Sequence, residues 1–356
     1  MSIRHITLAA LATLAAAQSA SAYELDYSID LLVPAAWPTS VVLLNVNPSD
    51  WASSTRRGAI EDAADAFLLN PSWFFIEPLE DDDSSIGPNN ENELTFTSNS
   101  ALLCGSSACT HLWYSGTDIV EADIYIKNDT YSVGNTKSDN LAYAGSYRSL
   151  QTLILHELGH MAGLMDEDGN YSVMGQDWNV LHAGSTDVSP YLDADSGAGL
   201  RELYGTRVGF ADLSVSHWGY GGSSGGFSTH ERNIVEDTSG VEPWHTTIGG
   251  EPYYVLGAGE IYRFEATLEN KSDTAYTVDV SIVISPDPII TGADTELVRI
   301  PGIALSPGPT EVWLPALVPE GTTGLYYIGA IIDAGGDVPE WDETNNGQYL
   351  VAAFSW

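Results

Sequence analysis

The sequence predicts two domains, an α/β domain over residues 23–207 and an all-β sandwich over residues 208–356. The first part alternates short apolar runs with amphipathic segments at helical spacing, as far as about Gly205. The second part shows alternating strands separated by Pro, Gly, Asn and Asp turns, without a convincing helix. A chain of 356 residues is long enough for two domains, and its 44% hydrophobic content can fill both cores.

Four segments define the first domain. Ser40–Val46 is a short, continuous apolar run and predicts a buried strand. Ser54–Leu69 has its apolar residues at helical spacing and predicts an amphipathic helix. Asp118–Ile126 alternates and predicts a half-exposed strand with one apolar face, formed by Val120, Ala122, Ile124 and Ile126. Tyr147–Leu164 predicts a helix long enough to be central.

Residues 1–22 have the pattern of a secretory signal peptide. Arg4 precedes an apolar run, Ile6–Ala17, and the small-residue site Ala20–Ala22 follows it. We expect cleavage before Tyr23 and a secreted protein, either extracellular or periplasmic. An uncleaved anchor is the alternative, but this run is short for a membrane span, so we expect no membrane insertion.

The formal net charge is -37, from 49 acidic and 12 basic residues. Nucleic acid and anionic membranes are poor partners for such a surface, so we expect neither. Solubility or a salty habitat explains the charge most simply. Calcium binding by acidic clusters is the second interpretation, although no EF-hand spacing is present. The candidates are Glu80–Asp83 and the loop residues Asn128, Asp129 and Asp139.

The chain has two cysteines, Cys104 and Cys109, in the segment CGSSAC. A pair this close in an exported protein predicts a small disulfide. A zinc site is the alternative, but His111 is the only other soft ligand nearby, and zinc needs more ligands than that.

The stretch HELGHMAGLMDEDGNYSVMG, residues 156–175, carries the candidate catalytic centre. His156 and His160 are four residues apart on the predicted helix, so both imidazoles lie on one face and can grip a zinc ion. Glu157 projects from the neighbouring position, where its carboxylate can take a proton from an attacking water without being a ligand. For these five residues alone, a chance match on a core helix is the alternative.

The continuation makes a chance match much less plausible. Gly163 allows the helix to break and the chain to turn sharply, and Asp166 follows three residues later. The spacing H-E-x-x-H-x-x-G-x-x-D resembles the elongated motif of metzincin peptidases, with aspartate in place of the usual third histidine, as in the snapalysin group. Met174 in YSVMG resembles the Met-turn, the apolar floor beneath the metal in that clan.

The resemblance covers most of residues 40–205. Leu192–Gly205 resembles the last helix of matrixin-like catalytic domains, and residues 121–126, EADIYI, resemble the edge strand along which these enzymes align a substrate. It implies a zincin fold with a mixed twisted sheet and an active-site helix, and Zn²⁺ bound by His156, His160 and Asp166. Gln176 stands where astacin-like members place a tyrosine ligand.

The third zinc ligand has alternatives to Asp166. Glu167 and Asp168 are adjacent to it, and a small change of register would recruit either. Asp187 superficially resembles the aspartate of aspzincins, but that assignment leaves the Gly163 and Met174 pattern unexplained. His182 is either a plain loop residue or a substrate contact. Residues 166–170 are also a weak candidate for a calcium loop, since they lack an outlying bidentate glutamate.

The C-terminal part resembles CARDB domains, immunoglobulin-like modules of secreted bacterial proteins. The pattern residues are Asp333, Val338, Glu340, Glu343, Asn345 and Asn346. Short polar side chains among them are expected to cap turns. An insertion around residues 218–250 contains three aromatic residues that we expect to be exposed, Trp218, Tyr220 and Trp244. The domain is predicted either to contact a substrate or a cell surface, or to act as a passive spacer.

The sequence therefore predicts a secreted zinc metalloendopeptidase that acts on a protein or peptide substrate. The alternative is an adhesion or binding protein in which the sandwich is the working part and the first domain a degenerate scaffold. A third, weaker hypothesis is an enzyme with a specialised target such as a cell-wall peptide.

Overall fold

The structure is a computed structural model. It describes residues 23, 25–26, 33–81, 85–131, 133, 149–167, 172–175, 181–183, 188–216, 219, 232–248 and 251–355. The predicted signal peptide, residues 1–22, lies outside them. The described residues are mostly β-structure with four α-helices. No helix among them is both long and apolar enough to cross a membrane.

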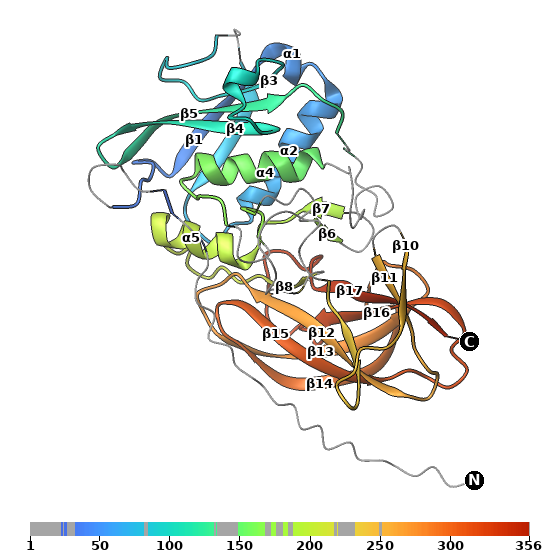
Figure 1. The fold of residues 1–356 in the computed structure, drawn as a ribbon. Helices are drawn as coiled ribbons and strands as arrows, with labels where there is room; N and C mark the ends of the chain where they lie inside the picture. The colour runs from blue at the N-terminus through green and yellow to red at the C-terminus, as the bar shows by residue number, and fades with distance from the viewer. Residues whose placement is uncertain are drawn as a thin grey trace, which may run out of the picture.

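A five-stranded mixed sheet forms the upper part of the molecule (Figure 1). Its order is β2-β1-β3-β5-β4. Four neighbouring strands run parallel, namely β1 (Val41–Val46), β2 (Phe75–Glu80), β3 (Glu93–Thr97) and β5 (Asp118–Lys127). The last strand, β4 (Ala108–Ser115), is antiparallel to β5 and forms an edge of the sheet.

The helices are α1 (Pro48–Trp51), α2 (Ser54–Leu68), α4 (Leu150–Met161) and α5 (Ala194–Tyr204), with a short 3-10 helix at Ser100–Leu102. Serine side chains cap two of them, because Ser53 accepts a hydrogen bond from the Arg56 N–H and Ser149 accepts one from Thr152. Helices α2 and α4 pack together against the sheet, and their apolar residues share one core with it. Helix α4 is buried on nearly all sides, which places it at the centre of this core.

The prediction for residues 118–126 was wrong in two respects. This segment is an interior strand, β5, and the edge strand is β4. Val120 is exposed and Ile119 is buried in its place, because a β-bulge opposite Trp113 and Tyr114 shifts the pleat. Since β5 lies between β3 and β4, its backbone groups are already paired and cannot accept a substrate strand.

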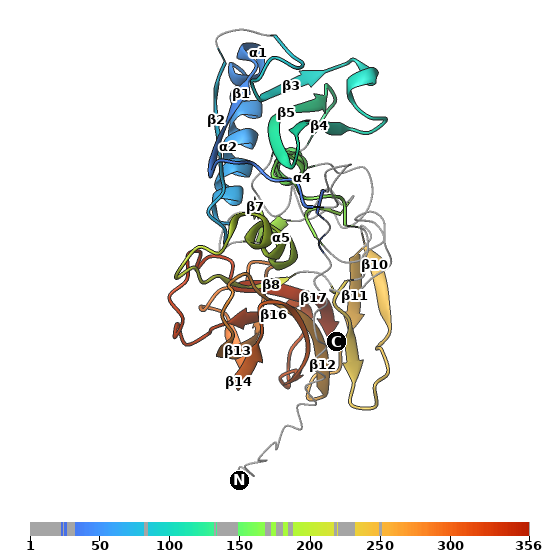
Figure 2. The same cartoon turned by 90° about the vertical axis from the view of Figure 1, so that its left-hand side faces the viewer.

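The C-terminal part is a β-sandwich. One sheet has the order β10-β11-β17-β16-β13-β14, and the other has β15-β12-β8, with β9 also pairing with β12. The strands are β8 (Leu213–Ser216), β9 (Val235–Asp237), β10 (His245–Ile248), β11 (Glu251–Val255), β12 (Ile261–Asn270), β13 (Tyr276–Ser285), β14 (Thr295–Leu305), β15 (Gly308–Leu317), β16 (Gly324–Ile332) and β17 (Gly347–Ser355). Apolar side chains from both sheets form its core. A short hairpin, β6 (Leu181–Ala183) and β7 (Val188–Pro190), precedes α5, which lies between the two parts (Figure 2).

Candidate metal centre and cleft

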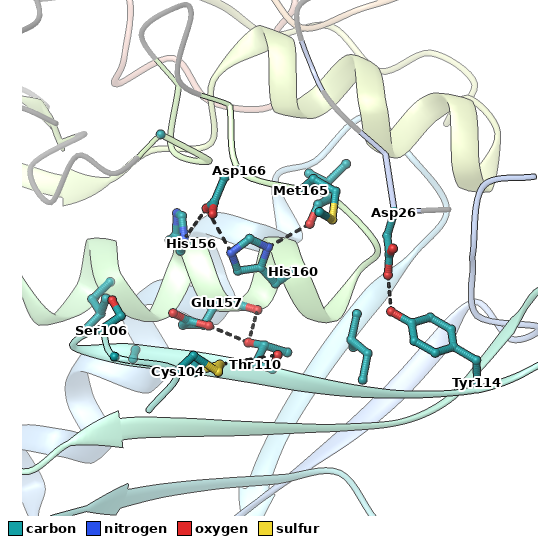
Figure 3. A pocket seen from close by; sticks show the side chains of 17 residues that line it. Asp26, Cys104, Ser106, Thr110, Tyr114, His156, Glu157, His160, Met165 and Asp166 are labelled. Carbon is teal, nitrogen blue, oxygen red and sulfur yellow. Dashed lines mark hydrogen bonds and ion pairs between the residues drawn. A yellow bond between two sulfur atoms is a disulfide. The ribbon is translucent and has the colours of Figure 1, made fainter. Parts of the chain in front are cut away.

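His156, His160 and Asp166 come together around the second half of α4 (Figure 3). Asp166 Oδ1 lies 3.3 Å from His156 Nε2 and 3.3 Å from His160 Nε2. Two ligand atoms placed about 2.1 Å from a tetrahedral zinc ion are about 3.4 Å from each other. Both Asp166 distances therefore fit edges of a zinc coordination tetrahedron, and all three ligand atoms lie within 4.8 Å of one another.

The hydrogen bonds of the two histidines leave the inward nitrogens free for a metal. His156 Nδ1 lies 2.8 Å from the Val173 carbonyl oxygen, and His160 Nδ1 lies 2.8 Å from that of Leu164. A carbonyl only accepts, so each Nδ1 carries the proton and the Nε2 of the neutral ring presents a lone pair. Two lone pairs and a carboxylate then face one point, which is the donor set that zinc prefers.

Without a cation, the histidine lone pairs and the Asp166 carboxylate repel one another, and a bound proton reduces this repulsion. Burial lowers the pKa of His160, but the hydrogen bond to Asp166 and the negative charge of Glu157 outweigh it and raise this pKa to about 9. Hydrogen bonds from the two histidines hold the pKa of Asp166 well below its usual range. The site thus stabilises positive charge at its centre.

Glu157 points from α4 into the same cleft and is buried. The hydroxyl of Thr110, on the edge strand β4, donates a hydrogen bond to Glu157 Oε2 at 2.6 Å. The carboxylate is therefore held beside the ligand group without belonging to it, since the three converging ligand atoms are those of His156, His160 and Asp166. Sequence analysis missed Thr110, because nothing in the local pattern links it to α4, which lies more than forty residues further along.

Gly163 and Met174 lie where the helix break and the floor were expected. Helix α4 ends at Met161, and Gly163 follows with φ of 92°. A side chain on Gly163 would also bring its Cβ to 2.8 Å from the Ala35 carbonyl oxygen. Met174 is buried and packs on α4 beside Gly159. Only glycine fits at position 163, and the chain then turns to bring Asp166 back over the helix.

The cleft beside the metal centre runs between α4 and β4. The predicted disulfide is confirmed, with the Cα atoms of Cys104 and Cys109 5.9 Å apart, and both residues line the cleft. His111 contacts Cys104 at 3.6 Å but meets paired sulfurs rather than free thiolates. At the other end of the cleft, the Tyr114 hydroxyl donates to Asp26 (Figure 3).

The alternative third ligands divide into two groups. Glu167 is described and buried, and its backbone N–H donates to the Met174 carbonyl, but its carboxylate is not among the converging ligand atoms. Asp168 and Asp187 lie outside the described residues, as does part of the 166–170 segment. For His182 only the backbone is described, in β6. Among the described candidates, Asp166 is the carboxylate that meets both histidines.

Two of the described calcium candidates have other partners. Asn128 Oδ1 accepts a hydrogen bond from Arg56, and Asp129 pairs with Lys127 at 3.1 Å. Asp139 and residues 82–84 lie outside the described residues. The described chain does hold another buried carboxylate group that could bind a metal ion, which is formed by Glu93, Glu121 and Asp123.

The pattern residues of the C-terminal part tie its segments together. Asp333 caps a turn by accepting the backbone N–H groups of Asp337 and Val338. Glu340 and Asn345 act over longer range instead, since they bond the Leu213 N–H and the Asp212 carboxylate beside β8. In the insertion, Trp244 is 70% exposed, whereas Trp218 and Tyr220 lie outside the described residues.

No protein-family model matches the chain, and no curated protein matches its sequence. Among solved structures, the chain is similar to the CARDB domain of a Pyrococcus furiosus protein crystallised with di-metal ions, with 18% identity over 42% of this chain and 97% of that chain and a TM-score of 0.26. A solution structure of the same domain matches with 18% identity over 41% and 95% of the two chains and a TM-score of 0.25. A domain of a Methanosarcina acetivorans protein, described as a cell-surface protein, matches with 20% identity over 26% and 75% and a TM-score of 0.21. Similarity at this level carries no argument about function.

Proposed function

We propose that this protein is a secreted zinc-dependent endopeptidase of the metzincin type, in which residues 208–356 form a CARDB-like module. The observation that carries the proposal is the convergence of three lone-pair donors at the spacing of a zinc tetrahedron, with both Asp166 distances at 3.3 Å. The buried carboxylate of Glu157 beside them supplies the base that peptide hydrolysis needs. The signal-peptide pattern of residues 1–22 supports export.

His156, His160 and Asp166 would hold the zinc ion, which when bound supplies Lewis-acid polarisation of a scissile carbonyl and of water. Glu157 Oε1 is the oxygen that the Thr110 hydroxyl leaves free, because that hydroxyl bonds Oε2. Glu157 takes the proton of the attacking water and then passes it to the departing amine. Peptide-bond cleavage consumes that water, so the proton balance closes without another reactant.

The edge strand β4 is the surface on which an extended peptide can lie. One side of β4 pairs with β5, and the cleft beside Glu157 is lined by Ala108, Cys109, Thr110, Leu112 and Tyr114. Backbone hydrogen bonds from a sheet edge hold a peptide in an extended conformation, whatever side chains the peptide carries. This arrangement favours cleavage of unstructured protein segments.

The test compares wild type with Glu157→Gln, using zinc analysis and cleavage of an unstructured protein such as casein. We expect one zinc per chain in both proteins, activity abolished by a chelator, and a loss of at least about a thousandfold in the variant. Glu61→Gln, at an exposed position of α2, is the control for the same substitution. Full cleavage by a zinc-loaded Glu157→Gln protein would contradict the mechanism.

Binding by the sandwich is the second candidate function. Trp244, which is 70% exposed, favours it, because aromatic residues are enriched at protein contact surfaces. A folded protein that binds no zinc and cleaves nothing would support binding over hydrolysis.

A further inference from the structure

Val173 precedes Met174 and bonds both a proposed zinc ligand, His156, and the N-cap of α5, Asp193. The Val173 carbonyl accepts the Nδ1–H of His156 at 2.8 Å. The Val173 N–H donates to Asp193 Oδ2 at 2.8 Å, and the neighbouring Ser172 hydroxyl donates to the same oxygen. The orientation of His156 therefore depends on where Asp193 holds the segment 172–175.

Asp193 in turn is fixed by the first turn of α5. It is the N-cap of this helix, and its Oδ1 accepts the Ser196 N–H at 2.8 Å. The next N–H, that of Ala194, donates to Glu269 Oε2 at 2.7 Å. Glu269 belongs to β12 of the sandwich. A carboxylate from the C-terminal part therefore completes the cap of α5, the helix whose N-cap Asp193 bonds the segment 172–175.

The contact around Glu269 is buried and contains charged side chains. Glu269 is 3% exposed, and two residues further along the chain Lys271 forms an ion pair with Asp212 in which both side chains are buried. Arg201 of α5 donates to the Lys271 carbonyl from the other side. Undocking would leave the Arg201 guanidinium without the Lys271 carbonyl and the Glu269 carboxylate without the Ala194 N–H, so α5 and β12 are expected to stay docked.

We propose that Glu269 is a positioning residue for the metal site and that the sandwich is part of the catalytic unit rather than an appendage. The path runs from Glu269 to Ala194 and Asp193, then through Val173 to His156. The inference rests on the proposed function, because it concerns how well the site holds zinc.

The test measures zinc affinity of the full chain by competition with a chelator, together with the absorption spectrum of the cobalt-substituted protein. Glu269→Ala is expected to weaken zinc binding about tenfold or more, as loss of an outer-shell partner does, and to change the cobalt spectrum. Glu269→Gln keeps an acceptor oxygen for the Ala194 N–H and should restore most of the affinity.

Glu265→Ala is the matched control. Glu265 lies on the same strand and also accepts a backbone N–H at 3.0 Å, but that N–H belongs to Ile234 beside β9 of the sandwich and not to α5. It should lower the unfolding midpoint without changing zinc affinity or the spectrum. If Glu269→Ala and Glu265→Ala behave alike, Glu269 is structural only and the inference fails. A wild type that binds no zinc would instead overturn the proposed function.

Discussion

The sulfur of Met174 occupies the space that a side chain on Gly159 would need. A Cβ built on Gly159 would lie 2.2 Å from Met174 Sδ. Gly159 is on α4 between His156 and His160, and Met174 is buried at the floor of the site. The glycine inside H-E-x-G-H is therefore explained by packing, since a larger residue would push the floor away from the helix.

Gly159→Ala is expected to weaken zinc binding and to destabilise the protein by about 1–3 kcal/mol, the usual range for overpacking. The matched control is Gly58→Ala in α2, where a Cβ meets nothing within 4 Å. That change should be neutral or stabilise by about 0.4–1 kcal/mol, because alanine favours the helix. Urea unfolding with and without zinc measures both effects. Equal behaviour of the two variants would contradict the packing argument.

Sequence reasoning found the candidate ligands because they lie on one short stretch with helical spacing. His156, His160, Gly163, Asp166 and Met174 fall within nineteen residues, so local geometry predicts their neighbourhood. It could not find Thr110 or Glu269, whose contacts depend on which strand becomes the edge and on how α5 docks onto β12. Both contacts belong to the tertiary structure, and no periodic pattern in the sequence predicts them.

The same limit explains the error over β5. Alternation at 118–126 indicates a strand but not its position in the sheet, and the bulge that buries Ile119 depends on pairing with β4. The disulfide was predictable because Cys104 and Cys109 have no other partners in the sequence.

Thr110→Val is expected to lower kcat by about ten- to a hundredfold while zinc content stays unchanged. It removes the hydroxyl that bonds Glu157 Oε2 and keeps the branched shape of the side chain on β4. Thr110→Ser retains the hydroxyl and should keep most of the activity. Steady-state kinetics on a soluble peptide gives kcat and KM for each protein. If the valine variant were fully active, Thr110 would have no part in holding the base.

Replacing both Cys104 and Cys109 with serine should raise KM more than it lowers kcat. The bridge closes a short loop that lines the cleft, and its sulfurs contact His111 and the Thr110 carbonyl. Chain-entropy arguments put its contribution to stability at roughly 2 kcal/mol for a loop of this length. Denaturant unfolding and peptide kinetics test the two parts separately. A loss of zinc in the double variant would show that the loop supports the metal site instead.

The free energy of unfolding should fall as pH rises from about 4.5 to about 8, because Glu340 titrates differently in the folded and unfolded states. Burial raises the pKa of Glu340 from 4.5 to about 8 in the folded protein. Over this interval the folded state binds the proton and the unfolded state has lost it, so rising pH favours unfolding. The stabilisation is complete below the unfolded pKa and is lost as pH rises through the folded one.

Glu340→Gln isolates this effect, because glutamine does not titrate and its one carbonyl oxygen still accepts the Leu213 N–H; the Asn346 amide loses its acceptor, which adds a cost that does not change with pH. Burial also raises the pKa of Glu93 and of Glu269, but their contribution to the slope is common to both proteins. Urea unfolding of wild type and variant at intervals from pH 5 to pH 8.5 gives the difference in unfolding free energy. As pH rises, the wild type should lose unfolding free energy relative to the variant. A difference that stays constant over the range would mean that Glu340 is ionised in the folded protein, and that the Leu213 N–H and Asn346 amide offset its burial.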